Sequence, residues 1–108
     1  MSTYDFGKTS FRNYVWVKGG QPFQDPLGLD IEMNAPGAFR LEVYDDDALV
    51  RTYRKKGQHG GWTSFYFNGS AVDDFGHVQL PLHGTYKLKL VNEAAGTREA
   101  HQGSLRYA

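Results

Sequence analysis

The chain contains no cysteine, which excludes a disulfide, a thiolate metal site and a cysteine nucleophile. It also lacks an excess of charge of either sign, because twelve lysines and arginines balance twelve aspartates and glutamates. A general polyanion-binding protein usually carries a strongly basic face. We therefore expect no nucleic-acid partner for the chain as a whole, which leaves only a local basic patch to consider.

Long apolar runs are missing as well. None approaches the roughly 20 residues that a membrane-spanning helix needs, so we expect no membrane partner. The N-terminus has no basic region followed by an apolar one, as a signal peptide would. Taken literally, the sequence predicts a cytoplasmic chain. A domain cut from a longer exported protein would have the same N-terminus.

Helical periodicity is the third absence. Thirteen glycines interrupt the sequence, and between them apolar residues recur at every second position. A length of 108 residues with 40% apolar residues is enough for one core. We therefore expect a single all-β domain over residues 1–108.

The clearest half-buried strand lies at residues 27–33, where four apolar side chains alternate with polar residues or glycine. The next strand, at residues 39–45, alternates in the same way. The side chains expected to point outward from it are Arg40, Glu42 and Tyr44. At residues 49–55 either Leu49 or Val50 leads the buried face, and the pattern leaves this register open.

The other segments with β character complete a strand count of seven or eight. They are residues 11–17, 62–67, 78–82, 85–91 and part of 98–107. In the segment at 62–67 one face has Thr63, Phe65 and Phe67, and the other has Trp62, Ser64 and Tyr66. This number of strands with short connections predicts an antiparallel sandwich of the immunoglobulin-like kind.

Gly84-Thr85-Tyr86 supports that architecture. A glycine two residues before a tyrosine that opens an alternating run is typical of the corner at which many immunoglobulin-like chains pass from one sheet to the other. In such a corner the tyrosine hydroxyl bonds back to the chain. We expect the same bond from Tyr86.

The middle of the chain combines these motifs in a fixed order. They are Pro36-Gly37, residues 39–45 and 49–52, Gly61 with the aromatic strand after it, Phe67-Asn68-Gly69, Gly76 and Gly84-Thr85-Tyr86. In this order they resemble the immunoglobulin-like domain of flagellar hook-capping proteins, a module that also ends many bacterial surface proteins. The resemblance implies a non-enzymatic scaffolding or adaptor role and no catalytic residue.

Residues that could carry chemistry are scattered. The aspartates at 45–47 and 73–74 favour tight turns and match no calcium loop. The histidines, at 59, 77, 83 and 101, lack the spacing of a metal site, and no serine lies in a nucleophile-elbow pattern. We expect no enzyme activity, no metal and no cofactor.

The basic cluster, with Arg51, Arg54, Lys55 and Lys56 around Tyr53, has two interpretations. It can form a stripe for phosphates with Tyr53 as a stacking ring. It can also be a solvated sheet face whose lysines discourage edge pairing, which is the more usual case.

Exposed aromatic side chains on strands are the best candidates for a partner surface. The residues expected to form it are Tyr44, Tyr53, Trp62 and Tyr66, together with Arg51. They favour a protein–protein interaction or assembly module, with self-association through an edge strand as one form of it. The alternative is a carbohydrate-binding module that uses the face of Trp62 and Tyr66.

Overall fold

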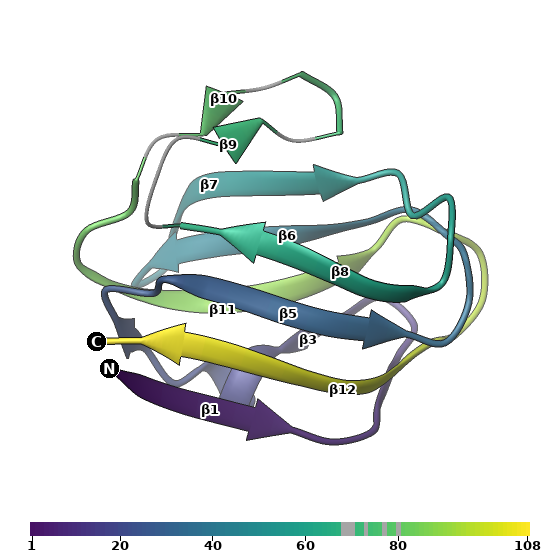
Figure 1. Cartoon of the computed structure of the whole chain (residues 1–108), viewed down its shortest axis with the longest axis horizontal. Coiled ribbons are helices and arrows are strands. Elements are labelled where there is room, and N and C mark those ends of the chain that lie inside the picture. The colour runs from purple at the N-terminus through teal and green to yellow at the C-terminus, as the bar shows by residue number, and fades with distance from the viewer. Residues whose placement is uncertain (68–70, 73, 77, 80) are drawn as a thin grey trace.

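Two five-stranded antiparallel sheets make up the fold. The computed structural model (Figure 1) describes residues 1–67, 71–72, 74–76, 78–79 and 81–108. Sheet I consists of β1 (Ser2–Phe6), β2 (Thr9–Phe11), β12 (Arg98–Tyr107), β5 (Gly28–Met33) and β8 (Gly61–Tyr66). Sheet II consists of β3 (Tyr14–Trp16), β4 (Phe23–Gln24), β11 (Thr85–Asn92), β6 (Phe39–Asp45) and β7 (Ala48–Lys55). A small hairpin of β9 (Ala71–Val72) and β10 (Val78–Gln79) lies at the top of Figure 1.

Each sheet has four rows, because two short strands share one edge row in each. β1 and β2 both pair with β12 in the same register, and β3 and β4 both pair with β11, separated by the short 3-10 segment η1 (Val17–Gly20). The eight rows pair in a nested order along the chain: first with eighth, second with seventh, third with sixth and fourth with fifth. A long hairpin rolled up in this way is a jelly roll.

The antiparallel sandwich predicted from the sequence is therefore confirmed, but its row order differs from that of immunoglobulin domains. In those domains the last strand lies beside the strand before it. Here the last row, β12, lies between the first and third rows, and β11 is in the other sheet. Local turn and strand motifs do not determine which rows become neighbours.

The core fills the space between the two sheets. Leu29, Ile31 and Leu105 of sheet I and Leu41 and Leu88 of sheet II are completely buried. Aromatic rings link the layers at one end, where the ring centroids of Phe39 and Phe65 lie 6.0 Å apart. The inward positions predicted at residues 29, 31, 33, 39, 41, 43, 65 and 67 are buried, whereas Leu27, which belongs to the same alternation, is only half-buried.

The predicted first strand, residues 11–17, is divided in two. Phe11 ends β2 in sheet I, and Tyr14 begins β3 in sheet II. The chain crosses between the sheets at Arg12 and Asn13, where the backbone N–H of Asn92 donates to the carbonyl of Asn13 at 2.8 Å. The N-terminal strand β1 was not predicted. The strand predicted at 78–82 is observed only as β10, and Leu80 lies outside the described residues.

On sheet II one prediction about side-chain direction is confirmed and one is corrected. Glu42 faces outward from sheet II, but it is only 7% exposed because Arg40, Tyr44 and Lys89 cover it. On β7 neither Leu49 nor Val50 is buried. A bulge between the pairs Val43·Arg51 and Tyr44·Leu49 puts an extra residue there, and Tyr53, at 3% exposure, provides the buried contact.

The predicted corner forms as expected. The Tyr86 hydroxyl donates to the backbone carbonyl of His83 at 2.7 Å. Gly84 has a backbone φ of 128°, a value that residues with a side chain rarely adopt. Its N–H donates to the Asp25 carboxylate at 2.7 Å. The corner therefore joins the start of β11 to the loop before β5.

Among the described residues, no helix is long and apolar enough to cross a bilayer.

Candidate functional site

Two large aromatic side chains project from the outer face of sheet I. Trp62 and Tyr66 lie on β8 and are 57% and 55% exposed. They are four residues apart on a strand, so they point to the same side with their Cα atoms about 13 Å apart, at about 3.3 Å per residue. Ser64 lies between them on the same face. The predicted exposure of both aromatic residues is confirmed.

A polar network lies on the same face of sheet I as the two rings. The Ser64 hydroxyl donates to Oδ1 of Asp30 at 2.6 Å, and Nη1 of Arg106 donates to Oδ2 of the same carboxylate at 2.6 Å. The hydrogen bond from Ser64, with the hydrogen bond and charge of Arg106, lowers the pKa of Asp30 although partial burial opposes this. Asp30 is therefore held as a carboxylate at neutral pH.

The guanidinium of Arg106 lies across a glycine. Gly28 is the Cα partner of both Arg106 and Tyr66, and a Cβ placed on Gly28 would collide with Nη2 of Arg106. Because Gly28 has no side chain, the Arg106 guanidinium can occupy the place above Gly28, next to the Cα partner Tyr66 on β8. Trp62 has Glu32 of β5 as its Cα partner. Oε1 of Glu32 accepts a hydrogen bond from Nε2 of Gln102 at 3.2 Å.

We name this surface the aromatic platform. It consists of Trp62, Tyr66, Asp30, Glu32 and Arg106. It brings together three adjacent rows, β8, β5 and β12. Asp30, Glu32 and Arg106 were not predicted as site residues. Period-two alternation indicates that they point outward, but only the row order shows that they lie beside Trp62 and Tyr66.

The other predicted site residues are not on the platform. Tyr44 is on the outer face of sheet II, where its hydroxyl donates to Oε1 of Glu42 at 2.8 Å. Tyr53 was predicted to point outward, and this was wrong: it is buried against Phe67, with ring centroids 5.2 Å apart. Arg51 lies beside it, with Nη1 at 3.4 Å from the Tyr53 hydroxyl. A phosphate stripe with Tyr53 as its stacking ring is therefore ruled out.

Sheet II has an aromatic cluster of its own, built around Lys89. The Lys89 ammonium lies 4.4, 5.1 and 5.3 Å from the ring centroids of Tyr14, Trp16 and Tyr44. It is also 3.7 Å from Oε1 of Glu42. Burial tends to raise the pKa of Glu42, but hydrogen bonds from Tyr44 and Arg40 and the nearby cations outweigh it and lower the pKa. These rings already surround a cation of the chain itself, which makes the cluster structural.

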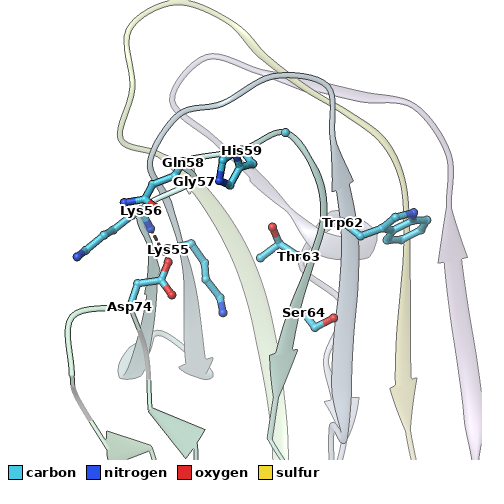
Figure 2. Close-up of a pocket in the computed structure, with 10 residues that line it drawn as sticks. Lys55, Lys56, Gly57, Gln58, His59, Trp62, Thr63, Ser64 and Asp74 are labelled. Atoms are coloured by element: carbon cyan, nitrogen blue, oxygen red, sulfur yellow. Dashed lines mark hydrogen bonds between the residues drawn. The ribbon is translucent and has the colours of Figure 1, made fainter.

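A groove of about 500 Å³ runs along the free side of β8, between it and β7. Lys55, Lys56 and His59 line it together with Thr63 and Asp74. Figure 2 shows Lys55 extending into the groove and Trp62 pointing away from it. The Lys55 ammonium lies 5.2 Å from the ring centroid of Phe65, and the backbone N–H of Lys56 donates to Oδ2 of Asp74 at 2.8 Å.

The turn aspartates and the histidines do not converge. In the part of the chain that the structure describes, no three histidine or carboxylate side chains are close enough together to hold a metal ion. Asp46 has φ of 53° in the turn between β6 and β7, as expected of a turn aspartate. Asp73 and His77 lie outside the described residues, as does the Asn68-Gly69 turn.

No protein-family model matches the chain, and no curated protein matches it either.

Proposed function

We propose that the chain is a non-enzymatic module that binds a protein partner through the aromatic platform. The observation that carries the proposal is the exposure of Trp62 and Tyr66 on one face, with Arg106 held in place beside them. Tryptophan, tyrosine and arginine are the residues that most often dominate the energy of protein interfaces. Because the hydrogen bonds of Asp30 fix Arg106 in the free chain, little side-chain freedom is lost on binding.

The resemblance to hook-capping domains implies the same kind of adaptor role. It is an argument from turn and strand motifs, and the row order of the two sheets differs from that of immunoglobulin domains. A fold alone does not give a function. The proposal therefore rests on the platform and not on the resemblance.

The test is affinity capture with matched variants, using extract from the cells that make the chain. Tyr66→Ala and Trp62→Ala should each lose the partner, because each removes a large contact from the platform. Tyr14→Ala is the control: Tyr14 is 53% exposed, much like Tyr66, but it lies in sheet II. If all four forms retain the same proteins, or none retains any, the proposal is wrong.

Carbohydrate is the second candidate, supported by the polar groups beside the rings. A sugar ring can stack on an exposed aromatic side chain while its hydroxyls bond to charged groups. The platform offers the carboxylates of Asp30 and Glu32 and the guanidinium of Arg106 for that purpose. The rings of Trp62 and Tyr66 are far enough apart to stack on two different sugars of one chain.

Tryptophan fluorescence separates the two candidates. Trp16→Phe leaves Trp62 as the one tryptophan, so its emission reports on the platform alone. Titration with an oligosaccharide library should shift this emission if the ligand is a glycan, and Tyr66→Ala should weaken the response. An unchanged emission across the library removes the carbohydrate candidate and leaves the protein partner.

A further inference from the structure

A sandwich of two open sheets has four edges, and three of them are protected here. The row of β1 and β2 is interrupted at Gly7 and Lys8. The row of β3 and β4 is broken by η1, where Lys18 and Gly19 have left-handed φ angles of 51° and 63°. Interruptions of this kind prevent a second strand from pairing along the edge.

The third edge, β7, is protected in another way. Its pairing with β6 contains a bulge, and Arg54 and Lys55 give the edge positive charge. The segment that contains β9 and β10 also reaches it, since the backbone N–H of Asp74 approaches the carbonyl of Arg54 at 3.4 Å. Bulges and basic side chains are common means of blocking an edge.

The fourth edge, β8, has none of these protections. It pairs with β5 without a register shift, from Gly28·Tyr66 to Met33·Gly61. Its six residues include no proline and no charged side chain. No described strand pairs with its other side. Every second residue of β8 therefore presents to the groove an N–H and a C=O that no described strand pairs.

The groove beside β8 has more positive than negative charge, because two lysines line it against one carboxylate, that of Asp74, among its lining residues. Lys55 and Lys56 line it, and neither ammonium group has a carboxylate within 4.0 Å among the described residues. The Lys55 ammonium lies over Phe65, which points to the inner side of β8. A strand added next to β8 would direct alternate side chains inward, towards Lys55.

We propose that β8 accepts an extended acidic segment of a partner protein, which adds a fifth row to sheet I. The main-chain groups of β8 would provide the affinity, as in other cases of strand addition, and Lys55 would select for carboxylates on the inward side. A second copy of this chain fits less well, because its β8 has no carboxylate to offer Lys55 and would bring a second Lys55 near the first. The inference stands on the edge and its charge and does not require the platform.

Two labelled peptides of equal length test the proposal by fluorescence anisotropy with the purified chain. One alternates threonine with glutamate and the other alternates threonine with lysine. We expect the glutamate peptide to bind and the lysine peptide not to bind. The affinity should fall as salt is added, because salt screens the contact with Lys55. The glutamate peptide with a fully N-methylated backbone should not bind, because it has no N–H to donate to β8.

A charge reversal identifies the selecting residue. Lys55→Glu should weaken binding of the glutamate peptide by about tenfold or more, which corresponds to about 1.4 kcal/mol, and should give binding of the lysine peptide. Lys87→Glu is the matched control, because Lys87 lies on β11 in sheet II, away from the groove. Thermal melting should show both variants folded, and Lys55→Gln replaces Lys55→Glu if the latter does not fold.

Three outcomes overturn the proposal. The first is equal binding of both peptides, or binding of the N-methylated peptide, because binding would then depend neither on the charge of Lys55 nor on main-chain hydrogen bonds to β8. The second is that no peptide binds and light scattering shows a dimer, which would make the occupant a second copy of the chain. The third is that no peptide binds to a monomer. None of these results bears on partner capture through Tyr66, so the proposed function is tested separately.

Discussion

At the scale of the residue, the platform depends on one carboxylate. Asp30 accepts hydrogen bonds from Ser64 and Arg106, and these hold the Arg106 guanidinium over Gly28. The same contacts lower the pKa of Asp30 below its usual value of 3.8. Asp30 thus links the shape of the candidate binding surface to the stability of the fold.

Asp30→Asn should reduce stability at pH 7 by about 1.5–3 kcal/mol, the usual value of a hydrogen bond to a charged group. The pKa of Asp30 is lowered in the folded chain, so its contribution is present above pH 3.8 and disappears as the pH falls through the folded pKa. Urea denaturation at pH 7 and pH 3 measures this. The difference between wild type and variant should shrink at the lower pH.

Asp5→Asn is the control for this prediction. Asp5 lies on β1, and its Cα partner Ser104 is in turn the Cα partner of Asp30, so it occupies the same face without the two hydrogen bonds. Its replacement should change stability little at either pH. A difference between wild type and Asp30→Asn that stays constant from pH 7 to pH 3 would contradict the assigned role of the carboxylate.

At the scale of the element, the alternation of apolar residues predicted most strands but not where they break. The last strand was expected in part of residues 98–107, and β12 takes up the whole range, with buried positions that alternate over most of its length. The break between Phe11 and Tyr14 could not be predicted. Both halves direct apolar side chains into the same core, so the pattern continues while the chain changes sheets. The outward direction predicted for Tyr53 was wrong for a related reason. One extra residue in β7 reverses the face on which the later residues of that strand lie.

The corner at the start of β11 gives a prediction at this scale. Tyr86→Phe removes the hydrogen bond to the His83 carbonyl and should cost about 1 kcal/mol. Tyr107→Phe is the control, because Tyr107 also packs against the core but its hydroxyl makes no hydrogen bond to the described residues. Equal urea midpoints for wild type and Tyr86→Phe would show that the bond does not stabilise the corner.

At the scale of the whole molecule, the nested row order creates the platform. It places β12 beside β5 and β5 beside β8, so residues 30, 66 and 106 meet although they are far apart in the sequence. A period-two pattern determines which face of the sheet a residue is on. It does not determine which strand lies next to that residue's strand. For that reason Trp62 and Tyr66 were predicted from the sequence, whereas Asp30, Glu32 and Arg106 were not.

Engineered cysteines test this row order, and the absence of natural cysteine makes the test clean. Asp5 and Ser104 are Cα partners on β1 and β12 and should form a disulfide when both are changed to cysteine and oxidised. Asp5 with Lys87, which lies in sheet II, is the control pair and should stay reduced. A disulfide in the control pair but not in the first would contradict the order.

Hydrogen exchange of the chain with and without its captured partner shows directly whether the partner binds the aromatic platform. We expect the partner to slow exchange at amides of β8, β5 and β12, the rows of the aromatic platform, and to leave the amides of β3, β11 and β6 unchanged. Protection confined to sheet II would contradict the claim, because it would place the partner on the face that contains Lys89 and its aromatic cluster.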